Sequence, residues 1–247
     1  MTNRYIYETA LAQSAVDLTC TTDDLKAPQP VAVISAPNEK ARKYLTLPFD
    51  FQLVSYGSSV VASTNEALRQ TAFDYIAADE PYTAFETPRI NDLSARLAPH
   101  GLHIQYMADY FLPDLSRLHV PICTYRTRVL YHEDFADLYT PAWHNALCID
   151  RKELDVLGVA AYNEDGKMVG LAACSADCDE MWQIGIDVLP AYRRQHIGSH
   201  LTAALALEII GRGKVPFYCA AWSNVRSTRN AVTCGFYPAW VELTAKK

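Results

Sequence analysis

The chain has 247 residues, of which 50% are hydrophobic and 20% are charged, as in folded globular proteins. It has 28 acidic and 22 basic residues, a formal net charge of -6 and no Lys/Arg-rich run, so nucleic-acid binding is not expected. The longest strongly apolar run, Leu201–Ile210, is too short to cross a membrane, and residues 1–21 lack the pattern of a secretory signal. We therefore predict a soluble cytoplasmic protein that does not bind membranes.

The seven cysteines are irregularly spaced, and none forms the Cys-x-x-Cys pair that zinc sites favour. We expect reduced thiols that pack as small apolar side chains, and no metal site. Redox activity of Cys174 and Cys178 is the alternative.

The first half of the chain gives mixed secondary-structure signals. Hydrophobic spacing, caps and turn residues predict helices at 5–16, 38–45, 65–77 and 90–97, and strands at 30–36, 51–62 and 102–106. No chemical motif is found there. We predict a smaller α+β domain over residues 1–122, and a weak echo of βα units leaves a degenerate duplication of the second half open.

The second half, residues 123–247, is more regular. Alternating apolar residues predict strands at 125–131, 156–162, 168–175, 181–189, 217–222 and 236–243, and helices are predicted at 132–139, 141–144, 199–212 and 227–233. The predicted order is β-α-α-β-β-β-α-β-α-β. Together the two halves predict an α+β protein whose larger domain is a mixed, mostly antiparallel sheet flanked by helices.

The segment with the clearest chemistry runs from Ile186 to Ser199. A buried strand ends at Pro190, a short basic loop follows, and a helix starts near Gly198. This order directs free backbone N–H groups and the positive end of a helix dipole to one point, which suits a phosphate. Arg193 and Arg194 add fixed positive charge, so the segment predicts a pyrophosphate site, with an ordinary turn as the alternative.

This segment resembles motif A of the GNAT N-acetyltransferase superfamily, whose usual form is Val-x-Pro-x-x-Arg-x-x-Gly-x-Gly/Ala. Val188, Pro190 and Arg193 match in register, and Gly198 falls on the second glycine. His196 replaces the first glycine, and histidine tolerates left-handed backbone better than most residues.

A second resemblance follows at the expected distance. Asn224 and Ser227 look like the Asn-x-x-Ala/Ser element of motif B, and Gly235-Phe236 looks like its Gly-Phe element. The resemblance implies that the strand near Phe217 parts from its neighbour to admit a cofactor, because unpaired backbone groups can bond the amide-rich pantetheine arm. It covers about residues 125–247 and leaves open a degenerate GNAT-like half in residues 1–122.

The resemblance implies acetyl-CoA as cofactor and direct acetyl transfer to a primary amine. The cofactor-binding residues that it implies are Ile186, Val188, Arg193, Arg194, Gln195, His196, Ile197, Gly198, Ser199, Asn224, Ser227 and Asn230. It does not supply the acceptor, which we leave as a small-molecule or peptide amine.

The residues that move protons are not fixed by the resemblance. Asp187 is a polar residue in an apolar strand and is our candidate base, with Gln183 on the same face as a neighbour that positions water. The alternative is a structural Asp187 bound to a nearby backbone amide. The family often places a tyrosine acid seven residues after the motif-B Asn, which here is Ala231. Tyr218 is our candidate acid, with Tyr237, Cys219 or water as alternatives.

Two functions therefore stay open. The first is an acetyl-CoA-dependent N-acetyltransferase, and a longer acyl chain is a variant of it. The second is a catalytically silent acyl-CoA sensor that contacts a partner through the first half of the chain. A homodimer is compatible with both.

Overall fold

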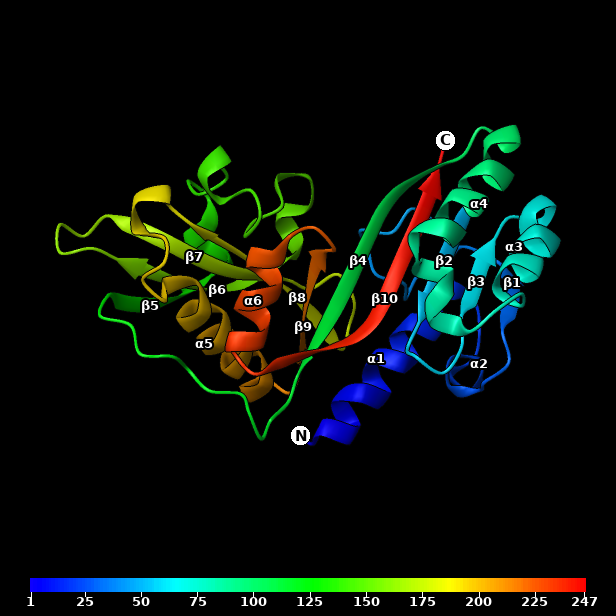
Figure 1. Ribbon diagram of the computed structural model, residues 1–247. Coiled ribbons are helices and arrows are strands. Elements are labelled where there is room, and N and C mark those ends of the chain that lie inside the picture. The colour runs from blue at the N-terminus through cyan, green and yellow to red at the C-terminus, as the bar shows by residue number, and fades with distance from the viewer. The chain divides into compact units, whose positions relative to one another are not determined.

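The computed structural model describes residues 1–247 as six α-helices and ten strands joined by short 3-10 turns (Figure 1). The helices are α1 (Asn3–Leu18), α2 (Thr22–Lys26), α3 (Arg69–Ile76), α4 (Thr87–Leu97), α5 (Ile197–Gly211) and α6 (Val225–Thr233). The strands are β1 (Val31–Ile34), β2 (Phe51–Ser55), β3 (Val61–Thr64), β4 (His103–Pro113), β5 (Arg126–Tyr131), β6 (Asp155–Tyr162), β7 (Met168–Ser175), β8 (Met181–Val188), β9 (Val215–Ala221) and β10 (Phe236–Lys246). None of these helices is both long and apolar enough to span a membrane.

The chain forms two compact units that are not continuous in sequence. Unit 1 contains Met1–Ile6, Phe111–Ala220 and Asn224–Tyr237, and unit 2 contains Tyr7–Tyr110, Ala221–Ser223 and Pro238–Lys247. These units differ from the predicted segments 1–122 and 123–247 because β4 and β10 each have residues in both units. The continuous boundary at residue 122 stays a prediction about domains.

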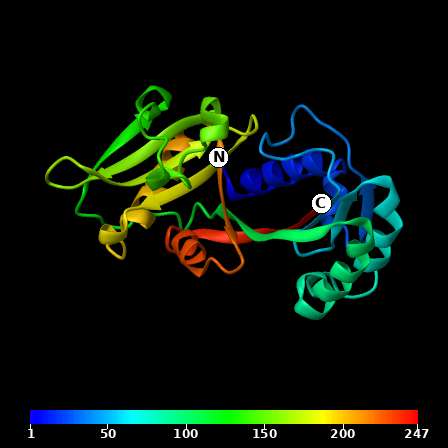
Figure 2. The same cartoon turned by 90° about the horizontal axis from the view of Figure 1, so that it is seen from above.

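Unit 1 is built on a sheet in which β5, β6, β7 and β8 pair antiparallel and β9 runs parallel to β8. Helix α5 packs on one face, where its apolar residues meet those of β6 to β9 in one core. The short turns between β5 and β6 lie over the other face (Figure 2). Phe135, Trp143 and Leu147 of these turns are buried in the core on that face. This mixed, mostly antiparallel sheet flanked by helices confirms the predicted fold class.

Unit 2 has its strands in the order β1-β3-β2-β10-β4. β2 pairs antiparallel with β3 and β10, and β1 is parallel to β3. Helices α3 and α4 cover one face, where Leu68, Tyr75 and Leu93 are fully buried. Ser63 of β3 points to the other face and donates to the carbonyl of Leu18 in α1 at 2.7 Å. The last strand of the chain, β10, is thus an interior strand of unit 2.

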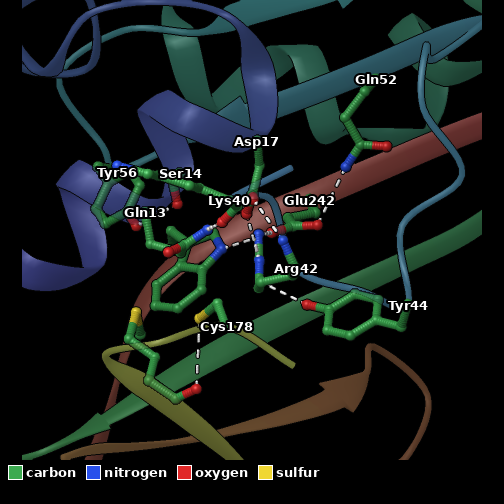
Figure 3. Close-up of polar contacts among 12 residues, drawn as sticks. Gln13, Ser14, Asp17, Lys40, Arg42, Tyr44, Gln52, Tyr56, Cys178 and Glu242 are labelled. Carbon is green, nitrogen blue, oxygen red and sulfur yellow. Dashed lines mark hydrogen bonds and ion pairs between the residues drawn. The ribbon is translucent and has the colours of Figure 1, made fainter. Parts of the chain in front are cut away.

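A buried cation holds distant segments of unit 2 together (Figure 3). The Arg42 guanidinium forms ion pairs with Asp17 of α1 and, at 3.0 Å, with Glu242 of β10. Glu242 also accepts hydrogen bonds from Gln52 at 3.1 Å and from Trp240 at 2.8 Å. Because the three charged side chains are almost fully buried, they depend on one another for compensation.

Four predicted elements are wrong. Residues 38–45 form turns and no helix, and the predicted strand 51–62 is two strands separated by a turn at Gly57, whose φ is 96°. The predicted helices 132–139 and 141–144 are only 3-10 turns, His132–Phe135 and Pro141–Trp143. In the other direction, β4 continues to Pro113, well beyond the predicted end at residue 106.

Candidate functional site

The loop between β8 and α5 takes a backbone shape that frees the start of the helix. His196, the residue before α5, has φ 61° and ψ 7°, and Arg194 has φ 63°. His196 therefore adopts the left-handed conformation that the missing glycine of motif A would take most easily. The first intrahelical bond runs from the His200 N–H to the His196 carbonyl at 3.0 Å. The N–H groups of Ile197, Gly198 and Ser199 consequently have no acceptor within the helix.

The polar side chains of this loop contact β8, Tyr125 and solvent. Arg193 Nε donates to the Val188 carbonyl at 3.0 Å, which ties the loop back to the end of β8. Gln195 Oε1 accepts from the Tyr125 hydroxyl at 2.6 Å. Arg193, Arg194, Gln195 and His196 are all exposed, so the residues directly before α5 present two guanidinium groups to solvent.

The parallel strands β8 and β9 part halfway along their length. Their pairing covers Met181–Ile184 and Val215–Tyr218 and stops there, although β8 continues to Val188 and β9 to Ala221. The Leu189 N–H donates to the Val169 carbonyl of β7, so alternation turns the backbone groups of Ile186 and Val188 toward β9. These groups face the region where β9 no longer pairs, as the resemblance implied.

Helix α6 lies against the start of α5. A Cβ on Gly198 would lie 3.2 Å from the Asn230 Oδ1, which is a tight contact, and 3.7 Å from a Val188 methyl, which is ordinary van der Waals contact. Asn230 Nδ2 donates to the Thr202 hydroxyl of α5 at 2.9 Å. The structure thus brings Val188, Gly198 and Asn230 together from three elements.

The side chains of Asn224, Ser199 and Ile197 have local structural roles. Asn224 caps α6 by accepting from the Ser227 N–H at 3.2 Å. The Ser199 hydroxyl donates to the His196 carbonyl at 3.1 Å. The Ile197 side chain is buried in the core beneath α5. Ile197 and Ser199 can therefore meet a phosphate through their backbone amides.

Tyr218 is the last residue of β9 that pairs with β8, and it is buried. Burial raises the pKa of its phenol to about 12, while hydrogen bonds with Ser227 and Asn230 act in the opposite direction. Tyr218 and its pair Ile184 belong to the core beneath α5. Because side chains alternate along a strand, Asp187 and Gln183 lie on the opposite face of the sheet.

The Asp187 carboxylate is held by the segment that covers its face. It accepts hydrogen bonds from the Asn145 N–H at 2.8 Å, the Asn145 side chain at 2.7 Å and the Ala146 N–H at 3.0 Å. Gly185 permits this approach, since a Cβ there would lie 1.9 Å from the Asn145 carbonyl oxygen. Gln183 lies four residues before Asp187 on the same face of β8, and its Nε2 donates to Cys219 Sγ at 3.1 Å.

Sequence reasoning missed the residues that hold this site from a distance. Asn145 binds Asp187 across 42 positions of sequence, and Tyr125 binds Gln195 across 70. The rings of Tyr125 and Tyr192 pack edge to face with centroids 6.0 Å apart, beside a cavity of about 610 Å³. Tyr192 lies within the motif-A loop and was an available signal, whereas Tyr125 precedes β5 and has no local signal in the sequence.

A loop with free helix amides thus lies beside two parted parallel strands in unit 1. Residues 123–238 form a domain of the acetyltransferase (GNAT) family, whose family model they match. This confirms the family that motifs A and B indicated, and acyl transfer is the activity that the family supports.

Solved structures that resemble the chain include GNAT proteins. One is a GCN5-related N-acetyltransferase from Kribbella flavida, with 20% identity and a TM-score of 0.49 over 63% of this chain and 64% of that one. Another is a GNAT-family acetyltransferase from Colwellia psychrerythraea, with 16% identity and a TM-score of 0.45 over 59% of this chain and 57% of that one. These two matches thus span less than two thirds of the other chains.

A Drosophila protein of 14% identity matches over 98% of this chain and 87% of that one, with a TM-score of 0.48. A search of curated proteins finds no significant match.

Proposed function

We propose that unit 1 transfers an acetyl group from acetyl-CoA to a primary amine of a small-molecule or peptide acceptor. The observation that carries the proposal is the end of β8–β9 pairing directly beside the free amides of α5. An elongated cofactor with a diphosphate at one end and an amide-bearing arm at the other fits this combination. Acetyl-CoA supplies an activated thioester there.

The diphosphate end is proposed to lie at the start of α5. The N–H groups of Ile197, Gly198 and Ser199 are the donors, and the helix dipole favours the negative charge. Arg194 supplies an exposed guanidinium from the loop, whereas Arg193 Nε already donates to the Val188 carbonyl.

The thioester end is proposed to lie between the parted strands. The Val188 N–H is directed toward β9 and has no cross-strand partner there. As a fixed donor, it can stabilise negative charge that develops on a carbonyl oxygen during attack by the amine. The Ile186 backbone groups, on the same side of β8, are available to the amides of the cofactor arm.

Proton transfer is assigned to both faces of the sheet. We propose Asp187 as the group that takes the proton of the attacking amine, with Gln183 positioning water beside it. A phenol carries its proton at neutral pH even without a shift, and burial raises the pKa of Tyr218 further, to about 12. We propose that Tyr218 gives this proton to the leaving thiolate. The three hydrogen bonds to Asp187 also suit a purely structural carboxylate.

Calorimetry with coenzyme A, followed by thiol release from acetyl-CoA with a panel of primary amines, tests the proposal. Gly198→Val should abolish binding because the added atoms meet Asn230 and Val188. Gly211→Val is the matched control at the other end of α5, where a Cβ meets nothing within 4 Å. Failure of the folded wild-type protein to bind coenzyme A would contradict the proposal.

A silent acyl-CoA sensor is the second candidate. Ala231, fully buried, stands where the family often has its tyrosine acid, and Tyr218 lies on the face opposite Asp187. A sensor binds acetyl-CoA with no thiol release for any amine, whereas the transferase releases thiol in proportion to acetylated amine.

A further inference from the structure

Unit 2 contains a cavity of about 670 Å³ that the transfer chemistry of unit 1 does not use. This volume is in the range that holds drug-sized ligands. Its lining joins the loop after β2, the 3-10 turn Pro81–Phe85, residue Trp222 and the start of the unit 2 part of β10. Every lining residue belongs to unit 2.

Aromatic rings form much of the cavity wall. Trp240 and Phe85 are buried; the Trp240 ring stacks on Tyr56, with centroids 5.3 Å apart and planes 17° apart. Tyr82 and Trp222 are exposed at 68% and 40%, although large aromatic side chains are usually more buried. Trp222 is braced by Phe85, with centroids 6.3 Å apart. The cavity therefore combines a rigid wall with two ring surfaces that a ligand can reach.

Three carboxylates line the same cavity, and no Lys, Arg or His does. Glu80 and Glu86 flank the turn Pro81–Phe85, each before a helical segment that it does not cap with its side chain. Asp109 comes from β4 and is half-buried, and this burial raises the pKa of its carboxyl. None of the three carboxylates receives a hydrogen bond or forms an ion pair within the protein. Glu80 and Glu86 are exposed to water, and no cationic side chain of the lining neutralises the three carboxylates.

We propose that this cavity binds a small organic cation, an ammonium group carried on an apolar or aromatic body. The carboxylates attract and neutralise the ammonium group, and the exposed faces of Tyr82 and Trp222 offer cation–π contacts. The apolar body packs against Phe85 and Trp240. An anion is repelled by all three carboxylates, and a neutral ligand gains no attraction from them. The proposal concerns binding by unit 2 and does not rest on acetyl transfer in unit 1.

The test uses a cation that cannot be acetylated, so that binding is separated from transfer. Phenethyltrimethylammonium is titrated into the full chain without acetyl-CoA, by calorimetry and by tryptophan fluorescence, and compared with uncharged 2-phenylethanol. We expect the cation to bind at least about tenfold more tightly than the alcohol, because only the cation gains both the carboxylates and the ring faces. Equal affinity of the two probes would overturn the proposal.

Variants locate the site. Glu80→Gln combined with Glu86→Gln should lower cation affinity at least tenfold, and Tyr82→Ala should lower it severalfold. Glu39→Gln combined with Glu66→Gln is the matched control, because it removes the same charge from exposed positions of unit 2 outside the cavity. If both double variants weaken binding equally, the attraction is not local and the proposal fails. Melting temperatures establish that each variant is folded.

Phenethylamine then tests whether the cation that binds this cavity is an acetyl acceptor or a ligand that does not react. If it is acetylated and the Glu80/Glu86 variant raises its KM, the cavity holds an acceptor. If it binds without being acetylated, the cavity holds a ligand that does not react. Both results support the cation site. If the protein transfers no acetyl group, the titration with phenethyltrimethylammonium still tests the cation site by itself.

Discussion

Asp187 is a carboxylate whose position fits both a catalytic and a structural role. Its position in an apolar strand suggests a base, and its three hydrogen bonds from Asn145 and Ala146 suggest an anchor for the segment over that face. The residue type and its strand face follow from the local sequence. Its partners do not, because they lie 41 and 42 positions away and the intervening turns have no regular period.

Asp187→Asn tests both roles. The new amide group would face a backbone N–H, so we expect the free energy of unfolding to fall by about 1–3 kcal/mol. Denaturant unfolding measures this loss. If Asp187 is also the base, kcat should fall by about 10²–10⁴. An unchanged kcat would leave only the structural role.

Asp155, at the start of β6, gives a prediction about pH. Burial raises its pKa to about 6, while the Cys148 N–H at 2.9 Å and the Tyr139 hydroxyl at 3.2 Å favour the charged form. An unfolded aspartate titrates near 4, so between about pH 4 and 6 the folded state binds more protons than the unfolded state. This group's contribution to stability therefore decreases as pH rises through that window.

Urea unfolding at several pH values checks this sign. Asp155→Asn should flatten the part of the stability profile between about pH 4 and 6, because the titrating group is gone. Asp134→Asn serves as a control, since Asp134 binds Arg128 at 2.7 Å in an exposed pair. A steeper fall in the Asp155 variant than in wild type would contradict the prediction.

At the scale of elements, local sequence signals predicted the helix and the strand that border the parted region, α5 and β8. α5 was predicted from its apolar run and terminal glycines, and β8 from its buried pattern. Residues 38–45 were wrongly predicted as a helix because their conformation depends on Arg42, whose N–H donates to Asp17 25 positions earlier. The predicted strand 51–62 spans two strands because its apolar composition continues across the turn at Gly57. Local periodicity cannot report such long-range bonds.

The left-handed turn before α5 is predicted to decide cofactor binding. His196→Gly suits a φ of 61°, so coenzyme A affinity should stay within about threefold of wild type. His196→Val places a β-branched residue there at a cost of about 1–2 kcal/mol or more, so affinity should fall about tenfold. Calorimetry gives both values. Equal affinities would show that the turn does not govern binding.

Hydrogen exchange tests the parting of β8 and β9. The amides of Ile186 and Val188 should exchange faster than those of Gly185 and Asp187, which face β7. Saturating coenzyme A should slow exchange at Ile186 and Val188 selectively. Slow exchange at these two positions in the free protein would mean that the strands remain paired.

At the scale of the molecule, the sequence identified the family segment but not how the units share their strands. The motifs of residues 123–238 are local and could be recognised. Unit 2, by contrast, needs Pro238–Lys247, and unit 1 needs Phe111 and the residues that follow it. No feature of the residues near position 122 indicates that β4 and β10 contribute to both units, because this division depends on the pairing of strands that are distant in sequence.

Fragments 1–122 and 123–247 are therefore not expected to fold separately. The first lacks Leu243 and Ala245, which are buried in the core of unit 2, and the second lacks Phe111, which is buried in the core of unit 1. Circular dichroism and limited proteolysis of each fragment should show neither cooperative unfolding nor protease resistance, unlike the full chain. A cooperative transition in either fragment would contradict this expectation.

Arg42→Met should destabilise the molecule strongly. It leaves Asp17 and Glu242 buried without a cation, and breaking such a buried pair costs about 3–5 kcal/mol. Arg96→Met is the matched control, because Arg96 pairs with Asp92 on the exposed face of α4, where a pair contributes about 0.5 kcal/mol. Thermal unfolding monitored by far-UV circular dichroism compares the two.

The interior place of β10 also sets an order of events during synthesis. β2 and β4 leave the ribosome long before β10, the strand that joins them, exists. Until then both strands expose unpaired edges, and such edges favour aggregation. A nascent chain arrested before residue 236 should accordingly bind chaperones, and arrest beyond residue 247 on a long tether should release them.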